Sequence, residues 1–291
     1  MERELWPVLY WHLKEAAKDF REKYVQHAAW ALVAVMLWAA LHDRPICWAC
    51  QEKNWSTTKL RPCSLPSPAT MSRRIDRLSV GFLWQALEER LRDDSGTYPG
   101  LTAFLDGKPL PVGGATKDPD ARYGRGASGM AKGYKLHTIW SNRAMPEAWD
   151  IRPMNVCEKN VACALLPQLK TGGGYIIADG SYHANDLFDL AAALGYCLAA
   201  PARKNSTGKG HGYQSPHRLR FLEQLRRPFG KALCESRGEI ERDYGQATCF
   251  GGGLAPLPAW VRGLDRVRTW VWAKLAINAA RILNNNALCH C

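Results

Sequence analysis

Residues 101–107 read LTAFLDG, and residues 174–180 read GYIIADG. In both stretches an apolar run typical of a buried strand ends in an aspartate that is followed by glycine. Because side chains at the ends of neighbouring strands converge at one edge of a sheet, we expect Asp106 and Asp179 to lie together there. The alternative for each pair is an ordinary Asp-Gly turn, which is common after a strand.

Two carboxylates held close together repel each other, and each is costly to remove from water. A divalent cation between them relieves both costs, and oxygen ligands suit Mg²⁺ or Mn²⁺. The two aspartates therefore predict a metal site at the edge of a sheet.

The rest of the chain predicts the sheet and its surroundings. Further strands are expected at 133–140, 148–153 and 196–200, and helices at 161–169, 185–195, 235–247 and 264–284. Strands that then alternate with helices predict a mixed α/β domain with helices on its sheet. Residues 1–95 show the three- and four-residue apolar spacing of an all-helical N-terminal domain. The turn-rich DSGTYPG at 94–100 predicts domains at 1–98 and 99–291.

A third acid lies in the predicted helix 235–247. Arg237 and Glu241 are four residues apart and so share one face of that helix, next to the apolar Ile240 and Tyr244. This pattern places an acid and an arginine where a helix packs on a sheet. An ordinary surface pair of an arginine and a glutamate is the alternative.

Together, Asp106 in FLDGKPL, Asp179 in IIADGSYHAN and Glu241 in SRGEIERDYGQ resemble the Asp-Asp-Glu triad of DDE transposases of bacterial insertion sequences. The most similar group carries its glutamate in a Tyr-Arg-Glu-Lys signature. The segment KGYKLH at 132–137 resembles the strand after the first aspartate of that group. The resemblance covers roughly residues 99–291. The chain has Cys234 in place of the signature tyrosine and Thr248 in place of its lysine, for which Arg242 is a substitute.

The resemblance implies an RNase H-like domain and a reaction. Its mixed sheet with flanking helices would carry the first two acids on adjacent strands and the glutamate on a helix. Asp106, Asp179 and Glu241 would hold two Mg²⁺ (or Mn²⁺) ions, which activate the attacking oxygen and stabilise the leaving one. Glu239 is a rival third acid. Double-stranded DNA, as element ends and as target, would be the substrate, bound by a homodimer on paired ends.

The net charge of +12, from 39 basic and 27 acidic residues, also predicts a polyanionic partner. Residues 201–291 carry 15 basic and 6 acidic side chains, net +9, and a basic, turn-rich insertion is expected at 203–232. Its cations would neutralise phosphates. A helix from Pro68 to Leu78 is a weaker candidate for major-groove recognition. The predicted DNA-binding residues are Arg73, Arg74, Arg203, Lys204, Arg218, Arg220, Arg226, Arg227, Lys231, Arg237 and Arg242.

Other sites are less favoured. His42, Cys47, Cys50 and Cys63 have zinc-ligand types, but their spacing matches no standard finger. The apolar run 28–41 is shorter than the ~20 residues of a spanning helix. We expect no zinc, no membrane segment, no small-molecule cofactor, and a cytoplasmic protein that associates with the nucleoid when bound to DNA.

Two histidines near the predicted triad have ordinary interpretations. His183 is expected as a solvated loop residue and His137 as a hydrogen-bonded core residue. Two functions remain beside the transposase: a descendant without catalysis that only binds DNA, and an RNase H-fold nuclease that does not transfer strands.

Overall fold

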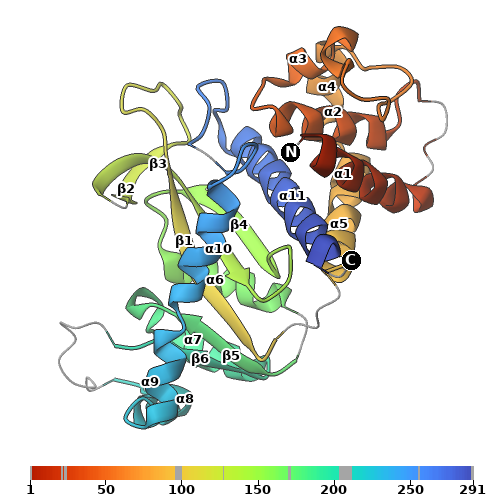
Figure 1. The fold of residues 1–291 in the computed structure, drawn as a ribbon. Helices are drawn as coiled ribbons and strands as arrows, with labels where there is room; N and C mark the ends of the chain where they lie inside the picture. Colours follow the sequence, from red (N-terminus) through yellow and green to blue (C-terminus); the bar gives the residue numbers. More distant parts are fainter. Residues whose placement is uncertain are drawn as a thin grey trace. The chain divides into compact units, whose positions relative to one another are not determined.

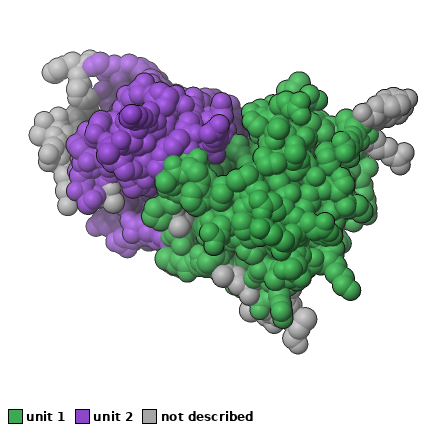
Figure 2. Space-filling view, turned by 90° about the horizontal axis from the view of Figure 1, so that it is seen from above, with its two compact units in different colours: residues 1–96, 246–261, 269–291 green, residues 97–245, 262–268 purple. Residues whose placement is uncertain are grey.

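A computed structural model gives the fold of residues 2–20, 22, 25–95, 100–126, 128–169, 172–202, 212–254 and 256–289. The chain forms two compact units (Figure 2). Unit 1 comprises residues 1–96, 246–261 and 269–291, and unit 2 comprises 97–245 and 262–268. The structure therefore divides the chain differently from the predicted boundary, because most of the C-terminal helix packs with the N-terminal helices.

Unit 1 is helical. Its N-terminal elements are α1 (Glu2–Ala16), η1 (Ala17–Asp19), α2 (Ala29–Leu41), α3 (Ile46–Ala49), η2 (Glu52–Trp55), α4 (Pro68–Arg74) and α5 (Leu78–Asp93). The long C-terminal α11 (Leu264–Cys289) joins it from residue 269 onward. Nearly every residue of α2 is buried, which explains its uninterrupted apolar sequence. No helix in the described part of the chain is long and apolar enough to cross a membrane.

Aromatic side chains fill much of the core of unit 1. Trp38 stacks on Trp55 with ring centroids 4.6 Å apart, and Trp6 meets both rings edge-on. A second stacked pair, Trp84 and Trp272, joins α5 to α11 at 4.6 Å. These rings bury large apolar areas in favourable offset or edge-to-face geometries. They explain how a set of short helices retains a stable core.

Unit 2 is built on one mixed sheet (Figure 1). Its strands are β1 (Thr102–Pro111), β2 (Arg122–Gly126), β3 (Gly129–Trp140), β4 (Ala148–Pro153), β5 (Gly174–Ala178) and β6 (Tyr196–Ala199). The order is β2-β3-β1-β5-β6, and β4 pairs with the second half of β3. β3 is antiparallel to β1, whereas β5 is parallel to β1 and β6 is parallel to β5. The predicted RNase H-like mixed sheet with flanking helices, preceded by a helical region, is confirmed.

Helices cover the sheet and connect its strands. They are α6 (Glu158–Leu165), η3 (Leu166–Gln168), η4 (Gly180–Tyr182), α7 (Asn185–Ala193), α8 (Pro216–Gln224), α9 (Pro228–Glu235) and α10 (Gly238–Thr248). α6 packs on β3 and β4, and α7 on β6. Tyr244 of α10 contacts β1 and β3 on the other face of the sheet. Its partner Thr138 is three residues from Lys135, which meets α6, and side chains an odd number of residues apart on a strand point to opposite faces.

Four sequence-based expectations need correction. β1 continues five residues beyond Asp106, because it pairs with β3 as far as Pro111 and Gly133. The described end of the basic insertion is helical rather than turn-rich, since Ser215 caps α8 and prolines begin both α8 and α9. The helix predicted at 235–247 is divided between α9 and α10. The helix predicted from Pro68 to Leu78 ends at Arg74, although Ser67 caps it as expected by accepting a hydrogen bond from the Thr70 N–H.

Candidate active site

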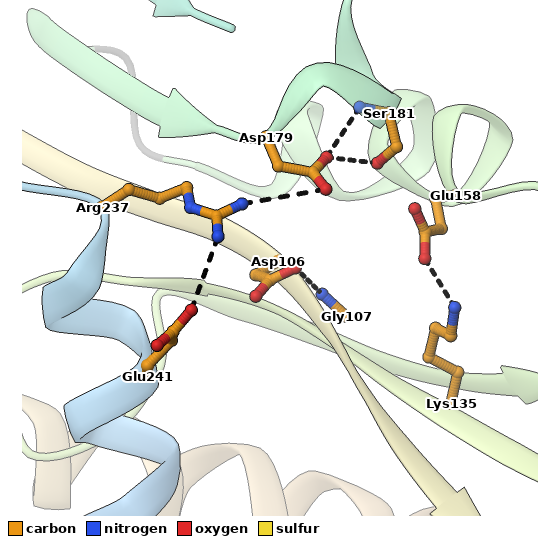
Figure 3. A network of polar contacts seen from close by, with 8 residues as sticks. All are labelled: Asp106, Gly107, Lys135, Glu158, Asp179, Ser181, Arg237 and Glu241. Carbon is orange, nitrogen blue, oxygen red and sulfur yellow. Dashed lines mark hydrogen bonds and ion pairs between the residues drawn. The ribbon is translucent and has the colours of Figure 1, made fainter. Parts of the chain in front are cut away.

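Asp106 and Asp179 leave neighbouring strands at the same level of the sheet. Leu105 and Ala178 form the last pair of the parallel β1–β5 ladder, and the two aspartates follow them directly. Since hydrogen-bonded strands lie about 4.8 Å apart, the two side chains start from adjacent backbones. Figure 3 shows both carboxylates near the point where β1 continues and β5 has ended. The prediction that the sheet brings these two acids together matches this register.

The carboxylate of Asp106 is poorly compensated. It accepts a hydrogen bond from the Gly107 N–H at 2.8 Å, and it is half-buried. The pKa of Asp106 is raised to about 6, mainly by burial and also by the charge of Asp179, while the Gly107 hydrogen bond and the Arg237 charge oppose the rise. A site that makes one carboxylate reluctant to ionise is a site that favours an added cation.

Asp179 is held in place from its other side. Its Oδ1 accepts the Ser181 N–H at 2.7 Å and the Ser181 hydroxyl, so that the side chain caps the 3₁₀ turn η4. Its Oδ2 faces the Arg237 guanidinium, with Nη1 at 3.8 Å. These contacts engage both oxygens of Asp179 and fix the orientation of its carboxylate.

Arg237 joins the aspartate to the glutamate. Its Nη2 lies 3.4 Å from Glu241 Oε1, so that one guanidinium bridges Asp179 and Glu241 (Figure 3). Arg237 precedes α10 and Glu241 lies in its first turn, where the helix dipole favours negative charge. The guanidinium therefore supplies positive charge between Asp179 and Glu241, two of the three predicted metal ligands.

Tyr244 attaches α10 to the sheet beside this group. Its hydroxyl donates to the main-chain oxygen of Asp106 at 3.0 Å and lies 2.7 Å from Thr138 Oγ1. Its ring is buried, as is Ile240 one turn earlier. Complete burial raises the pKa of Tyr244, with the Asp106 charge adding to the effect, so the hydroxyl remains a neutral donor. Glu241 therefore belongs to a helix that is fixed directly on the strand of Asp106.

A second ion pair supports the site from the opposite face of the sheet. Lys135 of β3 is 7% exposed, and its Nζ lies 2.5 Å from Glu158 Oε1 at the start of α6. Burial opposes ionisation of Glu158, but hydrogen bonds from Lys135 and Ser181 outweigh it and lower the pKa of this carboxyl. Ser181 thus contacts both Asp179 and Glu158. The sequence carried no signal for Glu158, and Lys135 lies within KGYKLH without a predicted role.

The acids fit a divalent metal in type, while their arrangement is incomplete. Asp106, Asp179 and Glu241 offer only carboxylate oxygens, the ligands that Mg²⁺ and Mn²⁺ prefer. Within the described ranges, no three carboxylate, imidazole or thiol side chains are close enough together to form a finished metal site. The reason is visible at Glu241, whose carboxylate contacts Arg237 and is 69% exposed. Asp106 and Asp179 are thus already side by side, whereas Glu241 is turned to Arg237.

The predicted DNA-binding residues have different environments. Arg218 is 8% exposed and donates from Nε to His183 Nε2 at 2.7 Å, so it supports the fold rather than a surface. Arg74 similarly contacts the main-chain oxygen of His27 and the Glu22 carboxylate. The exposed ones are Arg73, Arg220, Arg226, Arg227, Lys231 and Arg242. Arg203 and Lys204 lie outside the described residues.

Both histidine predictions require correction. His183 is not a solvated loop residue: it accepts the Arg218 bond and donates from Nδ1 to the Ala200 oxygen at 2.7 Å. His137 is buried as expected, at 1% exposure, but neither ring nitrogen has a hydrogen-bond partner among the described residues. Its burial lowers its pKa to about 4. The candidate zinc ligands Cys47, Cys50 and Cys63 are free thiols.

Comparisons with known proteins identify a family for this chain. Residues 98–276 match a protein family described as "Transposase DDE domain". The chain is similar to the cryo-EM structure of a piggyBac transposase synaptic complex with hairpin DNA, with 9% sequence identity and a TM-score of 0.45. The match covers the whole of this chain and 74% of the piggyBac chain. No curated protein matches the chain in sequence.

Proposed function

The chain belongs to the family of transposase DDE domains, and from this premise we propose that it cleaves and joins DNA at Asp106, Asp179 and Glu241. The observation that carries the proposal is the register of β1 and β5, which delivers two carboxylates side by side. Glu241 is linked to that pair through Arg237. We propose these three acids as the catalytic residues and as ligands of two Mg²⁺ or Mn²⁺ ions.

The chain's own residues would prepare and hold the reacting groups. When bound between the acids, the metal would activate the attacking oxygen and stabilise the departing one at phosphorus. At pH 7 to 8 Asp106 is ionised, because its pKa of about 6 lies below that range. Ser181 orients Asp179, and Tyr244 fixes α10 to the strand of Asp106.

Arg237 would have two partners in turn. Its guanidinium contacts Asp179 and Glu241 in the structure, at 3.8 and 3.4 Å. With the charge of these acids neutralised, the guanidinium would be available to a phosphate oxygen, which it would bind well as a planar donor. We place Arg237 and the exposed cations Arg220, Arg226, Arg227, Lys231 and Arg242 along the DNA, with Arg73 as a further contact from unit 1.

The partner and assembly follow from the same proposal. Double-stranded DNA would be bound both as element end and as target, by a homodimer on paired ends. Because strand transfer uses the freed 3′-hydroxyl as its nucleophile, it requires no covalent protein intermediate.

The decisive experiment compares acid substitutions within and outside the triad. Supercoiled plasmid carrying the DNA that flanks the coding sequence is incubated with Mg²⁺ and the full chain, and nicking is followed on gels. Asp106→Asn, Asp179→Asn and Glu241→Gln should each lower the nicking rate by about a thousandfold or more, as expected for loss of a two-metal clamp. Glu239→Gln is the matched control, since Glu239 is exposed in the same helical turn.

Two results would change the proposal. Nicking that survives Asp106→Asn would refute the active site. Nicking without joining of a labelled 3′-end to target plasmid would identify a nuclease rather than a transposase.

A further inference from the structure

β2 and the beginning of β3 form a two-stranded ribbon at the end of the sheet, residues 122–126 and 129–133 (Figure 1). It is continuous with the part of β3 that pairs with β1. The candidate active site makes no use of this ribbon, which we call the β2–β3 ribbon.

One face of the β2–β3 ribbon consists mostly of glycine, with Arg122 and Ala131 as its other residues. Gly124 pairs with Ala131 and Gly126 with Gly129, and these residues alternate onto the same face. A Cβ at Gly124 would lie 2.2 Å from the Met154 oxygen, and one at Gly133 would lie 2.4 Å from the Leu110 oxygen. The glycine face therefore lies directly on neighbouring backbone. This close contact fixes which face of the ribbon points outward.

The outward face carries a different set of residues. Tyr123 pairs with Lys132, and Arg125 pairs with Met130, so all four share one face. Tyr123 is 59% exposed and Met130 is 72% exposed, and Arg125 is also exposed. Lys132 is half-buried and donates to the Thr116 oxygen at 2.9 Å. The two ionisable side chains of this face, Arg125 and Lys132, are both cationic.

This outward face lies on the same side of the sheet as Asp106. Met130, Lys132, Tyr134, Leu136 and Thr138 alternate onto one side of β3. Thr138 is the cross-strand partner of Asp106 and contacts Tyr244 of α10. Six residues of strand separate Lys132 from Thr138, about 20 Å at roughly 3.3 Å per residue. That distance corresponds to about six base pairs of a duplex at 3.4 Å per step.

We propose that the β2–β3 ribbon is a DNA-binding surface that contacts the duplex about six to eight base pairs from the position attacked at Asp106. A two-stranded ribbon has the width that the major groove admits. Arg125 would bind phosphate, while Tyr123 and Met130 would contact sugars and base edges. The inference rests on the proposed function for the position of the cut, but not for the binding itself.

Charge distinguishes DNA from a protein partner here. Exposed tyrosine, methionine and arginine are also common in protein interfaces. The outward face carries two cations, Arg125 and Lys132, and no acid, and in a chain of net charge +12 such a face is complementary to a polyanion. A second copy of this cationic surface would be repelled.

The test measures binding without catalysis. The full chain, in EDTA, is titrated with a fluorescent 40-base-pair duplex at several salt concentrations. Arg125→Ala should weaken binding about five- to tenfold and reduce the slope of log affinity against log salt by about one, as for loss of one phosphate contact. Tyr123→Ala with Met130→Ala should weaken binding comparably and leave that slope unchanged.

Two matched controls lie elsewhere on unit 2. Lys159→Ala removes a cation from α6, on the opposite face of the sheet, and Leu101→Ala removes an exposed apolar side chain. Both should bind DNA like the parent chain. A photoreactive benzophenone side chain at position 130 should crosslink to the duplex, whereas one at position 101 should not.

The outcomes separate the two proposals. Unchanged affinity in the ribbon variants, while Asp106→Asn abolishes nicking, overturns the ribbon proposal and leaves the active site intact. Weakened affinity in the ribbon variants supports the ribbon even if Asp106→Asn continues to nick. A change of oligomeric state in Tyr123→Ala with Met130→Ala, at unchanged DNA affinity, would identify a protein interface and overturn the proposal.

Discussion

Two ionisable groups, Lys274 in unit 1 and Asp106 in unit 2, lie in opposite environments. In unit 1, Lys274 is 1% exposed, and its ammonium group donates to the Ala40 oxygen, to Asp43 Oδ1 and to the Gly252 oxygen, at 2.6, 2.5 and 3.0 Å. Three acceptors are all that an ammonium group can use. In unit 2, the Asp106 carboxylate has the Gly107 N–H and neighbouring negative charge.

The comparison distinguishes a buried charge that stabilises the fold from one that is ready to bind a cation. A buried charge whose partners are complete stabilises the arrangement of the segments that supply them. A buried charge that lacks a counterion costs folding energy, and the cost is recovered when a cation binds. Substitutions of individual groups should therefore change either the stability of the fold or the binding of a cation.

The largest effect on stability is expected at Lys274. Lys274→Met keeps the aliphatic stem but leaves two buried carbonyls and Asp43 without their donor, which should cost about 3 kcal/mol of unfolding free energy. Urea denaturation followed by tryptophan fluorescence would measure the loss. Lys53→Met, an exposed lysine of the same unit, is the control. Equal midpoints for the two variants would show that the buried ammonium is not a structural support.

His137 is an intermediate case, a buried polar ring without partners in the described structure. Its pKa of about 4 lies below the ordinary 6.5, so the unfolded chain binds more protons between these values and stability falls as pH drops through that window. His137→Leu should remove about 2 kcal/mol of this acid sensitivity. Thermal unfolding at pH 7 and pH 4.5 tests it.

The control for this pH experiment is His217→Gln, at an exposed position of α8. It should leave the pH dependence of unfolding as in the parent chain. An identical pH dependence in His137→Leu would contradict the assignment of the acid sensitivity to the buried ring.

The Lys135–Glu158 pair should affect metal binding by an intermediate amount. Lys135→Met removes the partner of Glu158, which shares Ser181 with Asp179, so the orientation of Asp179 becomes less fixed. Mn²⁺ affinity measured by calorimetry should fall about tenfold, as for other groups that orient metal ligands. Lys135→Arg should recover most of it. Weakened folding with unchanged Mn²⁺ affinity would show that the pair is structural only.

The smallest effect is a gain in stability at Asp106. An acid whose pKa is raised in the folded state opposes folding once pH exceeds its ordinary value of 3.8, and fully so above about 6. Asp106→Asn should therefore stabilise the metal-free protein by about 1 kcal/mol at pH 8 and not at pH 4. Thermal unfolding in EDTA measures this, and Mg²⁺ should raise the transition of the parent chain only. A loss of stability at pH 8 would contradict the comparison with Lys274.

The sequence predicted much of the sheet because its strands have clear local signals. β4 and β5 begin and end where expected. β2 was missed because RYGRG has two glycines and no apolar alternation, and its pairing depends on close contact with Met154. The end of β1 was missed because the length of a strand in a sheet is set by its partner, here β3.

The positions of Asp106 and Asp179 in the fold were predictable because both follow recognisable strands, and the pairing of Arg237 with Glu241 because of their spacing. The surrounding contacts were not. Glu158 and Lys135 are 23 residues apart in the sequence and meet only when α6 packs on β3. Arg218 shows the converse error, since a cation in a basic segment was expected at the surface and is buried against His183. Charge patterns in a sequence do not report which cations are already used inside the fold.

The chain passes between the two units four times, with the second crossing inside α10 and the fourth inside α11. Neither unit is therefore a continuous fragment. A polypeptide that stops at residue 245 retains all six strands and Glu241 but loses residues 262–268, where the Gly263 N–H donates to Asp118 and Arg268 pairs with Asp150. Limited proteolysis between residues 245 and 262 should accordingly leave the cut pieces associated, because each unit is assembled from both sides of the cut.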